Sequence, residues 1–480
     1  MDAPVVRTCT GKVRGLVRDG MVSFRGIPFA AAPQGSLRFQ LPAAPVGWHG
    51  IRDATAFGVA PPQLSAAPGI PAVWRPGDGL DCLTVNVWTP EPGATGLPVM
   101  VWVYGGAWKT GSSSQPSYEA TKLARCGVVV VTFNYRIGFE GFGQLPGMPA
   151  NRGLCDQIAA LHWVQHNITA FGGDPGAVTV FGESAGAGSV ALLVAAPSTR
   201  GLFQRAIAQS IPAGLLAAGE AERVTAVLAM QAQVPSTLEG FAELAPEAIL
   251  AIQDVPLRGS QTRISAFGPV IDGELVTGPP WEAIGNGAGH DIELVCGFTH
   301  DECRLFTQGR DLSTVDLTAV AASLDLGHDA VADYHAAYPG TTAAELCTVM
   351  FSDALFRMPT TWVAEAHAHA GGRSWLYDFT WQSPLLGACH AVDVPFTFGN
   401  ADTPMAARLL GCPPPADFTA LSEHIQQAWT TFARTGDPGW PRFDLVDRQT
   451  RIWDIPPSTA AYPLTASRRI WEKRTPRIVD

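Results

Sequence analysis

Hydrophobic residues gather in short continuous runs through the middle of the chain. Val99–Tyr104 and Val128–Asn134 are rich in β-branched and aromatic residues. Runs of this length without polar alternation are typical of strands buried on both faces of a sheet. Ala177–Phe181, Ile292–Gly297 and Trp375–Phe379 repeat the pattern further along. These segments therefore predict the strands of a central sheet.

Helical periodicity separates these predicted strands. In Gly153–Thr169 apolar residues recur every three or four positions, and Ala185–Ala196 is a helix of mostly small residues. Further helices are predicted over Leu317–Tyr338, Phe351–Ala370 and Ser422–Thr435. A strand, a crossover helix and a second strand in succession indicate an α/β fold with a mostly parallel central sheet flanked by helices.

Two regions depart from this alternation. In the first ninety residues, apolar runs at Val22–Ile27, Leu41–Trp48 and Thr84–Trp88 alternate with turns, which predicts an N-terminal antiparallel meander. Leu215–Leu257 is Ala-rich and mostly helical, and we expect residues 215–290 to form a helical insertion over the site described below. Because we find no internal repeat and no long linker, residues 1–480 are expected to form a single domain.

Composition narrows the classes of partner. The chain holds 32 Lys+Arg against 43 Asp+Glu, a formal net charge of −11, which argues against nucleic acid because phosphate binding needs a basic surface. Its 46% hydrophobic and 16% charged residues indicate a large buried core. The longest apolar stretches fall short of the ~18 residues that a membrane span needs, so no membrane partner is expected.

The N-terminal sequence and the cysteines suggest in which cellular compartment the protein resides. The N-terminus, MDAPVVRTCTGKVRG, has no apolar segment of the kind found in secretion signals. The nine cysteines are widely spaced and form no C-x-x-C pair, which suits reduced thiols. We therefore expect a cytoplasmic protein, and a monomer.

A Gly-x-Ser-x-Gly motif follows the predicted strand Ala177–Phe181. It reads GESAG at residues 182–186, and the predicted helix Ala185–Ala196 begins directly after the serine. So sharp a turn needs glycine at both ends and lifts the Ser184 hydroxyl above the sheet. The helix start adds amide donors and a positive dipole end. Ser184 is thus a candidate nucleophile, and an ordinary helix cap is the alternative.

Several segments of the chain resemble the type-B carboxylesterase/lipase family. They occur in the family's order and include Asn151–Gly188, Asp81–Pro90 (DCLTVNVWTP), Arg25–Phe39, Phe267–Gly273 and Arg434–Pro441. The resemblance covers nearly the whole chain. It implies the α/β-hydrolase fold and the hydrolysis of esters through an acyl-enzyme intermediate.

A serine nucleophile needs a histidine base and an acid that orients it, in the chain order serine, acid, histidine for this fold. His390 lies in a predicted loop after a strand and resembles the family's histidine segment, whereas His367 lies in a helical run. Asp301 and Glu302 follow a buried strand, where α/β sites lie. The family pattern places the acid at Glu302, although Cys303 stands where the family usually has glycine. Asp301 remains the alternative acid.

Backbone amides are expected to bind the developing oxyanion, because fixed donors stabilise that charge. By resemblance these are the amides of Gly106, Ala107 and Ala185. The Gly-Gly-Ala-x form at residues 105–108 is similar to a subclass whose roomier hole accepts bulky alcohols. Trp108 and Phe267 are candidate residues of the substrate pocket.

Other chemistry is not predicted. His162 and His166 have the spacing of a helical zinc pair, but Trp163 stands where the base of H-E-x-x-H would be, so we expect no metal. No nucleotide-binding motif occurs, and no cofactor is expected. Glu183 is expected to be a buried structural carboxylate held by hydrogen bonds. By resemblance Cys82 occupies a position that is disulfide-bonded in secreted relatives, and here we expect a free thiol.

These features predict a serine carboxylesterase for neutral esters with short-to-medium acyl groups, acting on a small-molecule substrate and water. A carbamate or amide hydrolase with the same triad is the first alternative. A non-catalytic binding homologue of the same fold is the second, and the intact Ser184, Glu302 and His390 argue against it.

Overall fold

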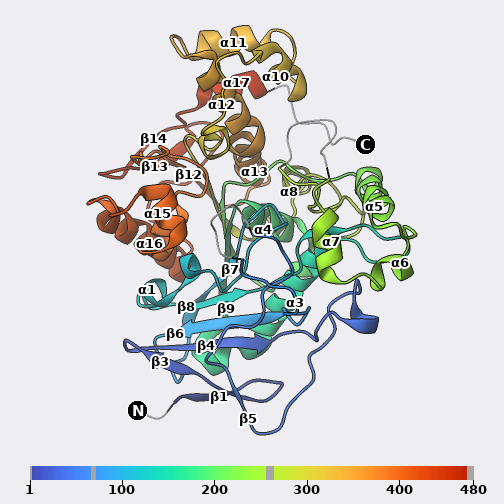
Figure 1. Ribbon diagram of the computed structural model, residues 1–480. Helices are drawn as coiled ribbons and strands as arrows, with labels where there is room; N and C mark the ends of the chain where they lie inside the picture. The colour runs from blue at the N-terminus through green and yellow to red at the C-terminus, as the bar shows by residue number, and fades with distance from the viewer. Residues whose placement is uncertain (1–2, 66–71, 256–263, 473–480) are drawn as a thin grey trace.

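The protein is described by a computed structural model for residues 3–65, 72–255 and 264–472. An 11-stranded sheet forms its centre (Figure 1). In spatial order its strands are β14 (Ser458–Ala461), β13 (Gln449–Trp453), β12 (Ser374–Phe379), β11 (Glu293–Thr299), β10 (Arg205–Gln209), β9 (Gly173–Glu183), β7 (Leu97–Val103), β8 (Val129–Phe133), β6 (Thr84–Thr89), β4 (Met21–Pro28) and β3 (Leu16–Arg18).

Neighbouring strands from β8 across to β13 pair in parallel, and antiparallel pairs complete both sides of the sheet. The predicted mostly parallel α/β sheet is therefore confirmed, and each of the five buried runs forms a strand. β10 does not follow from the sequence pattern, because Arg205–Gln209 holds a single β-branched residue, Ile207. Its pairing with β9 and β11 determines its conformation instead.

The predicted N-terminal meander exists, but β3, β4 and β6 are continuous with the main sheet through β8. The expectation of a strand in Leu41–Trp48 is wrong, since these residues are irregular. Pro42 and Pro45 lack the amide hydrogens that a sheet needs. A separate small sheet comprises β1 (Val5–Arg7), β2 (Lys12–Arg14) and β5 (Ile51–Asp53).

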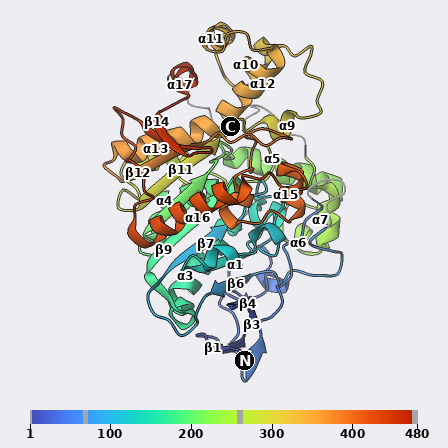
Figure 2. The same cartoon turned by 90° about the vertical axis from the view of Figure 1, so that its left-hand side faces the viewer.

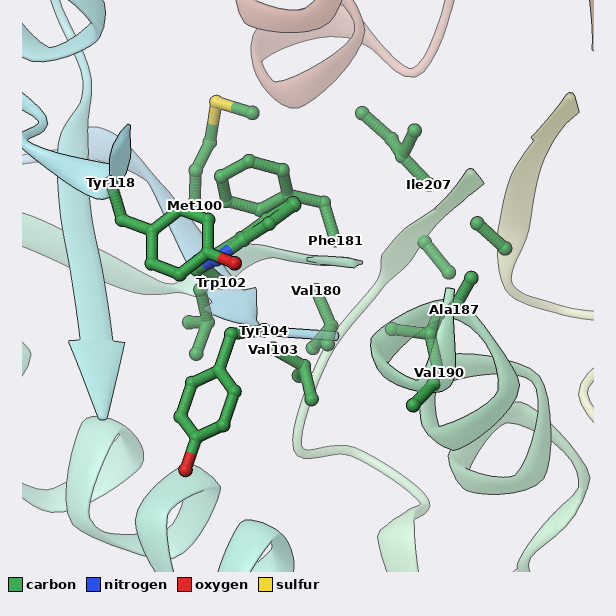
Figure 3. Close-up of a cluster of buried hydrophobic side chains, with 14 of the residues drawn as sticks. Met100, Trp102, Val103, Tyr104, Tyr118, Val180, Phe181, Ala187, Val190 and Ile207 are labelled. Atoms are coloured by element: carbon green, nitrogen blue, oxygen red, sulfur yellow. The ribbon is translucent and has the colours of Figure 1, made fainter. Parts of the chain in front are cut away.

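Helices cover both faces of the sheet (Figures 1 and 2). α4 (Ala185–Ala195) packs on β7, β9 and β10, and α16 (Phe418–Thr435) contacts β7 and β9. Side chains alternate between the faces, as Figure 3 shows for Trp102 and Phe181 on one side and Val103 and Val180 on the other. Both aromatic rings contact Phe398 of α14 (Val394–Phe398). Aromatic side chains thus pack against β7 and β9, and Ser184 directly follows β9.

The predicted insertion, residues 215–290, contains α5 (Ala218–Ala232), α6 (Leu238–Ala242), α7 (Pro246–Ile252) and α8 (Pro280–Gly285), and its residues 256–263 lie outside the described residues. The expectation of one helix over Leu317–Tyr338 is wrong. Two helices form there, α10 (Leu317–Ser323) and α11 (Ala330–Ala337), because Asp325 between them adopts a positive φ of 56°.

A second hydrophobic cluster, at the end of the molecule opposite the N-terminal strands, joins α10 and α11 to later helices (Figures 1 and 2). These are α12 (Ala343–Ser352), the π-helical turn η5 (Asp353–Arg357), α13 (Met358–His369) and α17 (Thr465–Trp471). Among the helices of the described ranges, none combines the length and apolarity needed to cross a membrane.

The remaining helical elements are short, apart from α3. They are η1 (Gly35–Leu37), η2 (Pro116–Tyr118), α1 (Thr121–Ala124), α2 (Gly138–Phe142), α3 (Arg152–Asn167), η3 (Ile168–Phe171), η4 (Pro197–Thr199), α9 (Arg304–Thr307) and α15 (Pro404–Leu410).

Candidate active site

Ser184 occupies the sharp turn between β9 and α4. Its backbone has φ 58° and ψ −126°, a conformation rare for residues other than glycine. A Cβ atom at Gly186 would lie 2.0 Å from the carbonyl oxygen of Val103, so only glycine allows this approach of helix to strand. The Ser184 amide donates to the Gln209 carbonyl at 2.9 Å. The chain is thus forced to project the Ser184 side chain beyond the sheet.

His390 bridges Ser184 and Glu302. Its Nε2 lies 2.8 Å from Ser184 Oγ, and its Nδ1 lies 2.5 Å from Glu302 Oε2. The His390 amide also donates to the Glu302 carbonyl at 3.0 Å, and the Thr299 amide donates to Glu302 Oε1 at 3.0 Å. All three side chains are buried, with at most 8% exposed. A serine, an imidazole and a carboxylate in this contact can activate the hydroxyl as a nucleophile.

The competing candidates lie elsewhere. Asp301 Oδ2 faces the Arg304 guanidinium at 3.3 Å and the Ala388 amide, as expected for a loop carboxylate. His367 is buried against the Ser374 hydroxyl and the Gly289 carbonyl. Cys303 has φ −77°, so the glycine usual in the family is not required at this position.

Three carboxyl groups surround the His390 imidazole. Burial alone would lower the pKa of His390, but Glu183, Glu302 and Asp393 outweigh it and raise that pKa above the ordinary value. Glu183 Oε1 lies 3.2 Å from His390 Nε2, and burial raises the pKa of Glu183. Glu183 is buried as expected, and among the described residues its Oε1 has no hydrogen-bond partner. Burial also raises the pKa of Asp393, to about 6.

The candidate oxyanion donors border Ser184. Gly106 has φ 116°, and a Cβ atom there would lie 2.2 Å from the Thr110 carbonyl oxygen. Ala107 and Trp108 follow with φ 54° and 52°, so three successive residues adopt positive φ. Within the described residues, the amides of Gly106 and Ala107 meet no protein acceptor. The Ala185 amide is the first of α4, where helical geometry leaves it free.

Two cavities meet at Ser184. The smaller encloses about 360 Å³ of empty space and includes Ala107, Trp108, Ala185, Phe267 and Leu355 in its lining. Trp108 is anchored there because its Nε1 donates to Ser189 Oγ at 3.0 Å. The larger is partly open to solvent and holds about 1500 Å³ of empty space. Its lining combines residues of the predicted insertion with polar and apolar residues around Ser184, among them Tyr118, Glu183, Gln253, Ile264, Leu305, Phe306 and His390.

Sequence reasoning missed several of these neighbours. Leu355 and Phe356 lie in a segment predicted as helix, where apolar residues are interpreted as part of the hydrophobic core. Lys109 and Asp254, which line the larger cavity, form an ion pair across 145 positions of sequence, so no local pattern reveals it. Asp393 could have been suspected, since it lies three residues after His390.

The two histidines considered above as metal ligands lie apart from this site. His162 and His166 are exposed on α3, with ring centroids 6.4 Å apart. Over residues 3–65, 72–255 and 264–472, no group of three His, Cys, Asp or Glu side chains is arranged to hold an ion. Cys82 is buried and free.

Comparisons with known proteins agree with this architecture. The chain is 37% identical over 476 residues to a para-nitrobenzyl esterase of Bacillus subtilis (strain 168), covering 95% of each chain. It is 34% identical over 468 residues to a phenmedipham hydrolase of Pseudarthrobacter oxydans, covering 92% of this chain and 94% of that protein. A solved structure of a PNB esterase matches with a TM-score of 0.87 and 35% identity, covering 98% of this chain and 99% of the other.

The family assignment extends along almost the whole sequence. The model of the Carboxylesterase family matches residues 2–459. Together with the PNB esterase structure, this match identifies the α/β-hydrolase fold and confirms the resemblance seen in the sequence. The chain belongs to the carboxylesterase family and is a carboxylic ester hydrolase.

Proposed function

We propose that this esterase acts through Ser184 as nucleophile, His390 as general base and acid, and Glu302 as the group that orients the imidazole. The observation that carries the proposal is the chain of contacts at 2.8 Å and 2.5 Å that joins the three side chains. Glu302 accepts from Nδ1, which leaves Nε2 free to take the serine proton.

The reaction then has two halves. Ser184 Oγ attacks the ester carbonyl carbon while His390 Nε2 takes its proton, and the amides of Gly106, Ala107 and Ala185 donate to the oxyanion. When the intermediate collapses, the bond from carbon to the alcohol oxygen breaks and His390 gives its proton to that oxygen. Water then attacks the acyl-enzyme with the same assistance, which releases the acid and restores Ser184.

The two cavities support a division of the substrate. His390 donates a proton to the leaving alcohol, and His390 lines the larger cavity, so the alcohol portion belongs there. The acyl portion then lies in the smaller cavity between Trp108, Phe267 and Leu355. We infer a preference for short acyl groups carried by bulky alcohols. Because Lys109 and Asp254 neutralise one another at the larger cavity, neutral substrates fit best.

Carbamate hydrolysis is a second candidate. Similarity to a phenmedipham hydrolase favours it, and the same nucleophile and amide donors would serve a carbamate carbonyl. A cytoplasmic location and a monomeric state stay predictions.

The test is a substrate panel on purified protein and two serine variants. Ser184→Ala should lose on the order of 10⁶ in kcat towards p-nitrophenyl acetate, as removal of a triad nucleophile does elsewhere. Ser313→Ala, which changes an exposed serine in the loop before α10, is the matched control and should retain full activity. Retention of a tenth of the turnover by Ser184→Ala, with contamination excluded, would contradict the proposal. Aryl carbamates and anilides, tested in the same assay, decide whether the protein hydrolyses esters in preference to carbamates or amides.

A further inference from the structure

The turn η5 contributes two neighbouring side chains to the candidate active site, each at a different place. π-helical turns are rare, and single turns of this kind are frequent at functional sites. Here Leu355 lines the smaller cavity, whereas Phe356 is fully buried beside the imidazole of His390. Adjacent positions of one π-helical turn therefore supply a wall of the smaller cavity and a ring beside His390.

Phe356 makes the closest aromatic contact of His390. The two ring centroids lie 4.2 Å apart with 30° between the ring planes, whereas the Phe306 centroid lies 5.4 Å from that of His390. The face of an aromatic ring carries partial negative charge and attracts cations. When His390 takes the serine proton, the resulting imidazolium therefore lies against a favourable surface.

The turn that holds Phe356 is also tied to the loop that holds Glu302. Arg357 pairs with Asp353 inside η5 and donates to the His300 carbonyl at 2.8 Å. The Cys303 amide donates to Ser352 Oγ at 2.9 Å. These two bonds flank Glu302 on either side. Cys303, the residue that replaces the family's usual glycine, packs in one buried cluster with Leu355 and Phe356.

We propose that Phe356 is a positioning residue for His390: its ring stacks on the imidazole, keeps Nε2 directed at Ser184 Oγ and stabilises the imidazolium. The inference rests on the proposed role of His390. Glu183 from β9, Glu302 from the loop after β11 and Asp393 before α14 face the same imidazole. A change from Phe to Leu alters none of these charges and keeps the site apolar, so its effect reports on the ring.

The experiment compares Phe356→Leu with Phe432→Leu. Phe432 is equally buried, packs edge-on against Trp375 and lies on α16, away from the triad. For each variant, kcat and KM for p-nitrophenyl acetate are measured from pH 5 to pH 10, with circular dichroism as a check of folding. Phe356→Met is the second variant, to be measured in the same way if Phe356→Leu does not fold.

For Phe356→Leu we expect kcat to fall about tenfold with KM within about twofold, because a loosened imidazole reacts less often from the productive geometry. The midpoint of the acidic limb should fall by roughly half a pH unit, since a stacked cation loses its aromatic partner. Phe432→Leu should keep the wild-type kcat and midpoint. An unchanged midpoint in Phe356→Leu, or an equal shift in Phe432→Leu, would overturn the inference. A wild-type profile without an acidic limb would instead refute the histidine base itself.

Discussion

The two sides of the candidate active site are held in place by different means. Ser184 is held by backbone, at the end of a central strand, with Gly186 against Val103 and the serine amide bonded to Gln209. His390 and Glu302 lie in loops beyond two other strands. Contacts of their side chains hold them, together with one backbone bond from the His390 amide to the Glu302 carbonyl. The Nδ1–Oε2 contact joins residues 88 positions apart, and the His390–Ser184 contact joins residues 206 apart.

This difference determines how each side responds to change. A backbone-held group has almost no freedom to adjust, and any added atom displaces main chain. A side-chain-held group depends on the chemistry of a few partners, so conservative substitutions there should alter rate or pH dependence while the fold stays intact. Substitutions on the two sides can therefore separate geometry from electrostatics.

The largest effect expected on the side-chain-held half is that of Glu302→Gln. The amide removes the charge that stabilises the imidazolium and can favour the wrong tautomer, and the equivalent Asp→Asn change in a Ser-His-Asp triad of another fold costs about 10⁴ in kcat. Asp301→Asn should cost far less, since Asp301 faces Arg304. Steady-state kinetics of both variants on one ester give the ranking, and the reverse order would move the acid to Asp301.

On the backbone-held half we expect the loss from Gly186→Ala to be smaller, about 10²-fold in kcat. The new Cβ would displace the Val103 carbonyl, and a shift of about 1 Å at the serine costs activity of that size. Gly219→Ala in α5 is the matched control, because a Cβ there meets no atom within 4 Å. Its activity should be unchanged. Equal activity in both variants would show that the sharp turn at Ser184 tolerates movement.

The same contrast explains what the sequence could predict. The glycines flanking Ser184 are required by local backbone geometry, so their spacing is visible in the sequence. The alternation of strands and helices around them is visible in the hydrophobic periodicity, whereas the choice of Glu302 as the acid rests on the resemblance to the carboxylesterase family. Gly106 and Ala107 follow a predicted strand, and their assignment as oxyanion donors also rests on that resemblance.

The rest depends on contacts between distant segments. Phe356 lies against His390 from a π-helical turn, whereas the apolar run that contains it predicts an ordinary helix. β10 forms because β9 and β11 pair with it, although its own residues show little strand preference. The split between α10 and α11 depends on one residue, Asp325, in a left-handed conformation. None of these features leaves a pattern within a short window of sequence.

Electrostatics around His390 provide a sharper test of the side-chain-held half. Glu183 raises the pKa of His390, so a neutral residue there should lower it. In Glu183→Gln the acidic limb of kcat/KM should move to lower pH by roughly one unit, because His390 then loses its proton at a lower pH. The pH profile of wild type and variant on the same ester measures the shift. A move to higher pH would show that Glu183 does not act as a nearby negative charge.

The smallest expected effect concerns the walls of the two cavities. Leu355 closes the smaller cavity, and Leu305 lines the larger one. Leu355→Ala lengthens the room for the acyl chain, and each methylene newly buried is worth about 0.8 kcal/mol, or about fourfold in kcat/KM. The ratio of hexanoate to acetate turnover should therefore rise several-fold, while preference among alcohols stays as in the wild type.

Leu305→Ala is the matched control for this change, since it removes the same atoms from the other cavity. It should alter the preference among alcohols, for example between methyl and benzyl acetates, and leave the acyl ratio unchanged. If the two variants exchanged their effects, the acyl and alcohol portions would have to be placed the other way round. Because Ser184, His390 and Glu302 are untouched in both variants, either result would leave the assignment of the nucleophile intact and bear only on how the substrate is oriented across it.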